Sequence, residues 1–133
     1  MIDEEILALS IEDLEWDIAD KMLGLHIHKE QGDGKLYISR SPMCHQWQEL
    51  PKYARDINAA KVATDAVLAT WSSLGLNILC GYGPEGRVYS ATIGGVIFPG
   101  AREVYARVES KTEEEARARV ALMAYWQIKK GEK

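Results

Sequence analysis

The residues with the most specific chemistry in this sequence are two pairs of arginine and tyrosine. Arg87 and Tyr89 are separated by one residue, as are Tyr105 and Arg107, and both pairs lie in runs that favour β-strands. Because side chains alternate between the two faces of a strand, each arginine shares a face with its tyrosine. Arginine suits phosphates and tyrosine rings suit bases. If the strands are neighbours and that face is open, the four residues form a small site for an anionic, nucleotide-like ligand. The alternative is a half-exposed sheet rim where their stems cover apolar surface.

A glycine-rich hexapeptide, Gly81-Tyr-Gly-Pro-Glu-Gly86, formally matches the GxGxxG pattern of dinucleotide-binding folds. That fingerprint requires a strand before it and a helix after it, so that the pyrophosphate meets the N-terminus of a helix. Here Pro84 lies inside the motif and a strand-like run follows it. The segment therefore predicts a hairpin turn.

Residue types that bind soft metals cluster at His26, His28, Cys44 and His45. Two histidines one residue apart on an extended segment point to one side, whereas adjacent side chains such as Cys44 and His45 diverge on most backbones. A zinc site needs three or four ligands that converge on a tetrahedron. We predict no metal and no other cofactor, and the convergence of these four residues is left open.

Nucleophile motifs are missing from the sequence. No serine lies in a G-x-S-x-G elbow, and neither Cys44 nor Cys80 has the flanking signature of a catalytic cysteine. The sequence does not exclude a catalytic pair of carboxylates, because the separation of two carboxylates depends on the tertiary structure. We predict that the protein is not an enzyme and that no residue is catalytic.

The composition is that of an ordinary globular domain, which predicts a single domain over residues 1–133. The chain has a formal net charge of −4, and two cysteines fit a reducing cytosol. No apolar run is long enough to span a membrane, the acidic start is unlike a signal peptide, and an acidic balance argues against duplex nucleic acid. The charge is uneven. Residues 1–40 carry ten acidic and four basic side chains, and residues 41–133 carry ten acidic and twelve basic ones. An acidic total therefore leaves room for an anionic ligand.

Apolar periodicity, caps and turn residues predict the elements that position these side chains. They indicate helices at both ends of the chain and a cluster of strands between them. We expect a helix over 3–25 with a capping box at Ser10, a strand over 35–39, a helix over 56–74 stopped by Gly75, a hairpin of strands 76–80 and 87–93, a loop over 94–101, a strand over 103–108, and a helix that begins at Thr112 and reaches Ile128.

Three blocks of the chain resemble a small bacteriophage protein family, the phage ABA sandwich domain. The first is Glu4-Glu-Ile-Leu-Ala-Leu9 with Leu14-Glu-Trp-Asp-Ile-Ala-Asp-Lys-Met-Leu-Gly24, which is similar to the family's acidic opening and helix end. The second is Leu50-Pro-Lys-Tyr-Ala-Arg-Asp-Ile-Asn-Ala-Ala60, and the third is Thr112-Glu-Glu-Glu-Ala-Arg-Ala-Arg-Val-Ala-Leu122. The blocks keep the family's order and extend over nearly the whole chain. Lys61 departs from the pattern, since the family usually has a tryptophan there.

The resemblance implies an α+β fold, a three-layer α/β/α sandwich around a small antiparallel sheet. It also implies a phage or prophage protein that acts in the host cytoplasm. No catalytic residues follow from it. The fold that it implies agrees with the elements expected from the residues themselves.

Two functions of different classes follow. The first is a non-enzymatic binding protein with a counter-defence role, which sequesters a small nucleotide signal or blocks a host defence protein. The second is a structural or regulatory protein–protein interaction module of a phage complex, and we expect a homo-oligomer. Four tryptophans, more than one small core needs, favour an interface; they are Trp16, Trp47, Trp71 and Trp126.

Overall fold

The computed structural model describes residues 3–29, 32, 34–39, 47–98 and 100–130. It has mixed α and β structure with two antiparallel sheets, each of three strands. The helices are α1 (Asp3–Ala8), α2 (Ile11–Asp17), the π-helix η1 (Ile18–Met22), α3 (Ile57–Thr70) and α4 (Glu113–Lys130). The strands are β1 (His26–Lys29), β2 (Leu36–Ser39), β3 (Gln48–Glu49), β4 (Leu74–Gly83), β5 (Gly86–Ile97) and β6 (Arg102–Ser110).

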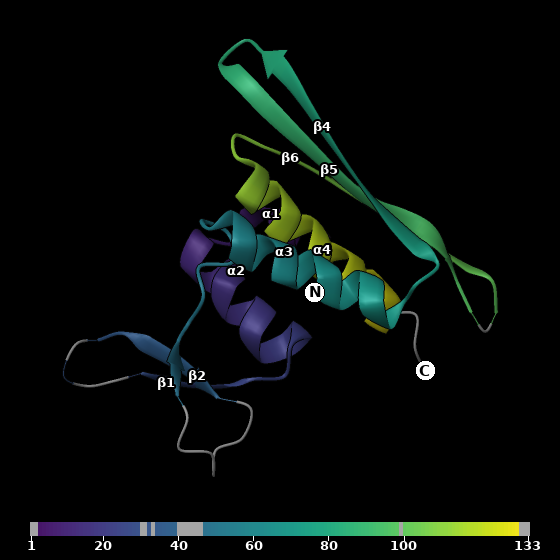
Figure 1. Ribbon diagram of the computed structural model, residues 1–133. Helices are drawn as coiled ribbons and strands as arrows, with labels where there is room; N and C mark the ends of the chain where they lie inside the picture. The colour runs from purple at the N-terminus through teal and green to yellow at the C-terminus, as the bar shows by residue number, and fades with distance from the viewer. Residues whose placement is uncertain (1–2, 30–31, 33, 40–46, 99, 131–133) are drawn as a thin grey trace.

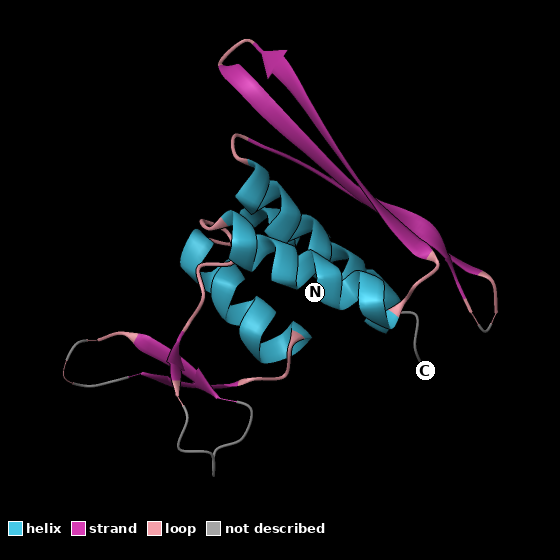
Figure 2. Ribbon diagram, in the orientation of Figure 1, coloured by secondary structure: helices cyan, strands magenta, loops and turns pink. Residues whose placement is uncertain are grey.

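The long sheet has the strand order β4-β5-β6, so β5 lies in the middle. Helix α4 contacts β5 and β6 on one face of this sheet, and α3 lies beside α4 (Figure 1). Helices α1 and α2 contact α4. The small sheet, β1-β2-β3, lies beyond the helices at the opposite end of the molecule (Figure 2).

Helix α4 forms the centre of the structure. Its residues 118–124 are all buried, so it has no polar stripe along this stretch. A helix that is buried all round must be covered on several sides, and here the long sheet, α3 and the N-terminal helices supply that cover. The largest apolar side chains with no exposure are Ile6, Leu14, Ile18, Val120, Leu122, Ile93 and Ile128.

The predicted helix starts are confirmed by their caps. The Ser10 hydroxyl accepts a hydrogen bond from the N–H of Asp13 at 3.2 Å, which separates α1 from α2. The Thr112 hydroxyl accepts from the N–H of Glu115 at 3.2 Å, where α4 begins. Such caps satisfy N–H groups that have no partner within the helix, which is why they can be read from short segments of sequence.

Two predicted boundaries are wrong. Helix α3 ends at Thr70 rather than at Leu74, which begins β4. Gly94 and Gly95 belong to β5 rather than to a loop, because both pair with β4 and β6. Gly95 has a φ of 149°, and a Cβ there would lie 2.6 Å from the carbonyl oxygen of Ser73. Glycine therefore permits a close approach of two chain segments instead of ending the strand.

The long sheet has two unlike faces. One face carries buried apolar residues against α4, among them Ala91, Ile93 and Val108. The other face, called here the outer face, carries exposed side chains such as Leu79 and Tyr105. Within the described residues no helix lies on the outer face (Figure 1). The α+β class with antiparallel sheets is therefore seen, and the three-layer sandwich is not confirmed.

Candidate functional site

The register of β5 and β6 separates the two predicted arginine–tyrosine pairs. Tyr89 lies opposite Ser110, whereas Arg107 lies opposite Thr92 and Tyr105 opposite Gly94. Directly paired residues share a face and neighbours along a strand alternate. Arg87 and Tyr89 are therefore on the face that α4 covers further along, and Tyr105 and Arg107 are on the outer face. The predicted single site of four residues is thus divided into two pairs, and ligand binding by either pair stays a prediction.

The first pair lies near the end of the β4–β5 hairpin and gains a third member there. Tyr82 of β4 is directly opposite Arg87. The Arg87 guanidinium carbon lies 6.0 Å from the centre of the Tyr82 ring, and Arg87 Nη1 donates to the Tyr89 hydroxyl at 3.4 Å. We call Tyr82, Arg87 and Tyr89 the tip cluster. It brings one cation and two aromatic rings together at the surface.

The charge of the tip cluster faces solvent. Hydrogen bonding to Tyr89, and then to Tyr82, raises the pKa of Arg87. A guanidinium is charged at every physiological pH even without such a shift. Tyr82 is 83% exposed and Arg87 is exposed as well. A cation over a tyrosine ring is an attractive arrangement that is weak in water and strengthens when a partner excludes the water.

The turn of the hairpin explains how the cluster is positioned. Gly83 and Gly86 pair with each other, which leaves Pro84 and Glu85 as the two turn residues. Pro84 fixes its own φ at about −65°, and Gly86 adopts a φ of 117° that favours glycine. The hairpin prediction for this segment is confirmed, and no helix follows the motif as a dinucleotide site requires. The hairpin end extends past α4 (Figure 1).

Tyr82 was missed by the sequence analysis, although a signal for it exists. Folding the chain about a two-residue turn at Pro84 and Glu85 places residues whose numbers add to 169 opposite each other, as in the observed pairing of Tyr82 with Arg87. The position of the two-residue turn therefore predicts that Tyr82 lies beside Arg87. The spacing of arginine and tyrosine within one strand does not predict it.

The second pair is engaged with its own sheet. The Tyr105 ring lies over Gly94, since a Cβ on that glycine would be 3.6 Å from the ring. Arg107 forms an ion pair of 2.9 Å with Glu109 and donates to the Ser90 hydroxyl at 3.3 Å. These contacts lie within the sheet, and both ligand binding by this pair and the alternative of a half-exposed sheet rim stay predictions.

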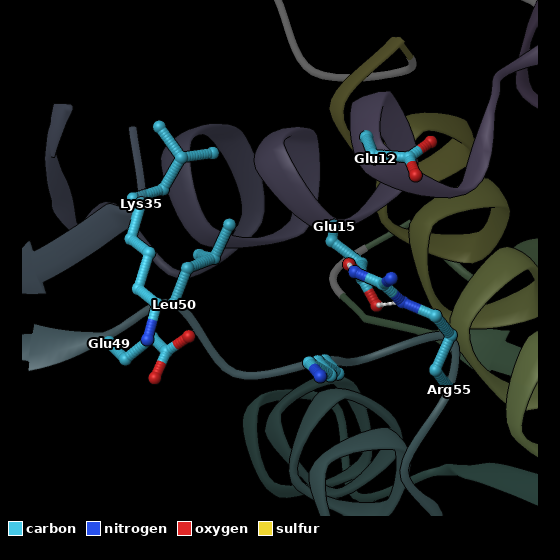
Figure 3. Close-up of a pocket in the computed structure, with 8 residues that line it drawn as sticks. Glu12, Glu15, Lys35, Glu49, Leu50 and Arg55 are labelled. Atoms are coloured by element: carbon cyan, nitrogen blue, oxygen red, sulfur yellow. Dashed lines mark hydrogen bonds and ion pairs between the residues drawn. The ribbon is translucent and has the colours of Figure 1, made fainter. Parts of the chain in front are cut away.

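A small polar pocket lies between α2, the β2–β3 strands and the segment before α3 (Figure 3). In Figure 3 Glu15 and Arg55 point toward each other on one side, with Lys35 and Glu49 on the other. The volume is about 120 Å³. Sites for small molecules occupy roughly 300 Å³ or more, so this pocket is too small for a nucleotide. It is lined by Glu12, Glu15, Lys35, Leu36, Glu49, Leu50, Lys52 and Arg55.

The carboxylate of Glu15 is the most buried charge in this pocket, at 2% exposure. It accepts from Arg55 Nη2 at 2.6 Å, from Arg55 Nε at 3.2 Å and from the N–H of Ala54 at 3.1 Å. The hydrogen bonds to Glu15 raise the pKa of Arg55. Burial, and after it the negative charge of Glu15, raises the pKa of Tyr53 to about 12. Because its oxygens are occupied in this way, Glu15 joins α2 to the start of α3.

A larger groove of about 380 Å³ lies where η1, α3 and α4 meet. Its lining combines apolar and aromatic side chains with polar ones, and the Lys129 ammonium lies 5.8 Å from the centre of the Tyr125 ring. Two lining residues, Met22 and Leu23, come from the end of the π-helix η1. The groove is lined by Met22, Leu23, Ala66, Val67, Thr70, Trp71, Tyr125 and Lys129.

Of the four metal-binding candidates, Cys44 and His45 lie outside the described residues. His26 and His28 lie one residue apart on β1, and the His28 ring centre is 5.8 Å from that of Trp47. Among the residues that the structure describes, no three His, Cys, Asp or Glu side chains are grouped as a metal site requires.

No family model, no curated protein and no solved structure matches this chain. In the part of the chain that the structure covers, no helix combines the length and the apolar character needed to cross a membrane.

Proposed function

We propose that this chain is a non-enzymatic binding protein that recognises a partner protein with the end of its β4–β5 hairpin. The observation that carries the proposal is the tip cluster, in which Arg87 contacts both Tyr82 and Tyr89 on an exposed, protruding hairpin. Tyrosine and arginine are enriched among the residues that dominate binding energies at protein interfaces. Contacts that Arg87 makes with both rings before binding would lower the entropy that it loses on association.

The shape of this surface favours a protein over a nucleotide as the partner. Small molecules bind in concave sites that bury most of their surface, whereas the tip cluster lies on a protruding hairpin. The four-residue nucleotide site also loses its main support, since Tyr105 and Arg107 lie on the other face of the sheet. Sequestration of a small nucleotide signal is therefore the second candidate, favoured only by the phosphate-binding chemistry of Arg87.

The biological setting that we propose is a phage or prophage protein in the host cytoplasm that blocks a host defence protein. The sequence blocks that resemble the phage ABA sandwich proteins support this setting. The three-layer architecture of that family would be completed if a helical partner covered the outer face. The alternative is an interaction module of a phage complex, which the exposed rings of Trp16 and Trp47 favour.

Quantitative co-purification from bacterial cells tests the proposal. Tagged wild-type protein is compared with the Tyr82→Ala/Arg87→Ala variant and with Arg107→Ala, a matched control on the outer face. We expect a specific partner whose recovery falls at least about tenfold in the tip variant, the effect of losing roughly 1.4 kcal/mol, and stays unchanged in the control. Equal recovery with all three proteins would contradict the proposal.

Isothermal titration calorimetry tests the second candidate. Cyclic dinucleotides and ADP-ribose derivatives are titrated into the wild-type protein and into Arg87→Ala. Heat that is lost in the variant would support nucleotide sequestration at the tip cluster, and absence of heat with every compound would reject it.

A further inference from the structure

The two edges of the long sheet differ in their protection. Edge strands expose unpaired N–H and C=O groups, and proteins usually guard them with charges, prolines or covering side chains. Strand β6 carries four charged residues, Arg102, Glu103, Arg107 and Glu109. Strand β4 reads Leu-Gly-Leu-Asn-Ile-Leu-Cys-Gly-Tyr-Gly and has neither a charge nor a proline along ten residues.

A side chain from α4 also covers the β6 edge. The Gln127 amide oxygen accepts from the N–H of Tyr105 at 3.1 Å, and its amide nitrogen donates to the carbonyl oxygen of Tyr105 at 2.7 Å. Gln127 thus makes the two hydrogen bonds that a further strand would make with Tyr105. No comparable cover of β4 is found within the described residues.

The same pair of hydrogen bonds reveals which β4 groups face outward. The main chain of Tyr105 faces the open edge, so its partner Gly94 directs its own N–H and C=O toward β4, where it lies opposite Gly75. Alternate residues of a strand face opposite sides. The N–H and C=O groups of Leu76, Ile78, Cys80 and Tyr82 therefore point away from β5, toward the open edge of the sheet.

We propose that the β4 edge pairs with the β4 edge of a second copy of this chain, in antiparallel orientation, to form a continuous six-stranded sheet. A strand without charges brings no like charges together when it pairs with itself. The pairing has a twofold axis and is closed, because Gln127 occupies the main-chain groups of Tyr105 and charged side chains guard the rest of the β6 edge. The proposal does not depend on the partner of the tip cluster.

The side chains of β4 fit this arrangement. Residues whose main-chain groups point to the open edge pair with each other across the two copies. These are the even-numbered residues of β4, so their side chains share one face of the joined sheet. Leu76 and Ile78 are only half-buried against the core, and in the dimer they lie against even-numbered residues of β4 in the second copy. On the outer face Leu79, 61% exposed, loses contact with water in the same way.

The expected dimer is reversible. Ten strand residues extend about 33 Å, and an interface made of one strand pair and its flanking side chains is at the small end of specific interfaces. Its formation should therefore depend on protein concentration in the micromolar range.

Two measurements on the unmodified protein test the proposal. Sedimentation velocity from about 5 µM to about 500 µM should show mass rising from 14.9 kDa toward twice that value. Amide exchange resolved by residue should show protection at Leu76, Ile78 and Cys80 that increases with concentration. A monomer at every concentration would overturn the proposal, and so would a dimer in which these three amides exchange as fast as in the monomer.

A pair of proline variants supplies the control. Cys80→Pro removes an outward-facing N–H without breaking a bond to β5, and Glu109→Pro does the same at the β6 edge. We expect Cys80→Pro to weaken dimerisation at least about tenfold and Glu109→Pro to leave it unchanged, with circular dichroism and Trp fluorescence confirming that both fold. Equal dimerisation of folded Cys80→Pro would overturn the assignment of the edge, and the exchange data decide the case if that variant does not fold.

Discussion

Arg119 donates a hydrogen bond to the main-chain carbonyl oxygen of Ile6 at 2.7 Å, although the two residues are 113 positions apart in the sequence. The same guanidinium donates to the carbonyl oxygen of Leu9 at 2.9 Å and to the Glu115 carboxylate at 3.0 Å. Helix α1 has only six residues and is too short to be stable alone. Arg119 therefore holds α1 on α4 by satisfying carbonyl groups at its C-terminal end.

Replacing Arg119 should destabilise the protein strongly. Arg119→Leu leaves the carbonyl groups of Ile6 and Leu9 without this donor and removes the ion pair with Glu115, so we expect a loss of about 2–4 kcal/mol in the free energy of unfolding. Arg117→Leu is the matched control, because among the described residues the ion pair of Arg117 is the i,i+4 pair with Glu113 on the same helix, and its loss should cost less than about 1 kcal/mol. Urea denaturation measures both. Equal losses would show that Arg119 does not anchor α1.

Glu115 should make stability depend on acid pH. Burial acts to raise its pKa, but hydrogen bonds from Ser110 and Arg119 prevail and hold the pKa of Glu115 below the ordinary value of 4.5. A carboxyl group with a lowered pKa in the folded state stabilises the fold above its unfolded pKa, and this contribution disappears as pH falls through the folded pKa. We expect part of the stability to be lost below about pH 4.5, and Glu115→Gln to reduce that loss. Glu103→Gln, at an exposed position on β6, serves as the control in urea titrations at several pH values.

Asp17 should act with the opposite sign. Burial, which outweighs the attraction of Lys21, raises the pKa of Asp17 above its ordinary value of 3.8. The folded state therefore binds the proton more tightly than the unfolded state, and stability falls as pH rises from about 3.8 through the folded pKa. Asp17→Asn should be more stable than wild type at neutral pH and should lack this decrease. Thermal unfolding at pH 4 and pH 7 measures it against Asp65→Asn, an exposed site on α3, and a less stable Asp17→Asn at pH 7 would contradict the assignment.

Gly95 should not tolerate a side chain. A methyl group there would meet the Ser73 carbonyl oxygen at 2.6 Å, and the φ of 149° is strained for alanine. We expect Gly95→Ala to cost at least about 2 kcal/mol in unfolding free energy. Gly81→Ala on β4 is the control, since a Cβ at that position meets no atom within 4 Å. Similar stability of the two variants would show that the close approach of Gly95 to Ser73 does not require glycine.

What could be predicted from sequence was mostly local. The caps at Ser10 and Thr112 and the hairpin turn at Pro84 depend on residues within a few positions of each other, and these predictions are confirmed. The α3 boundary and the strand character of Gly94 depend on pairing with distant segments, which overrides local preference.

For the candidate site, too, local features could be predicted from the sequence and features set by distant pairing could not. Arg87 and Tyr89 were identified because two-residue spacing within one strand shows that they share a face. The face of Arg107 relative to Arg87 follows from the β5–β6 register, and a shift of one residue would reverse it. That register is a tertiary property, since the burial of β6 against α4 sets it. No pattern within either strand contains it.

The contact between Arg119 and Ile6 also sets an order of events during synthesis. Helices α1 and α2 leave the ribosome long before the helix on which they rest, so Ile6, Leu14 and Ile18 are without their final cover during that interval. At the usual rates of translation, more than a hundred residues take on the order of 10 s. Residues 1–40 carry six more acidic than basic side chains. Like charges on such segments repel, so during that interval this excess of negative charge would oppose association of the uncovered apolar residues with other copies.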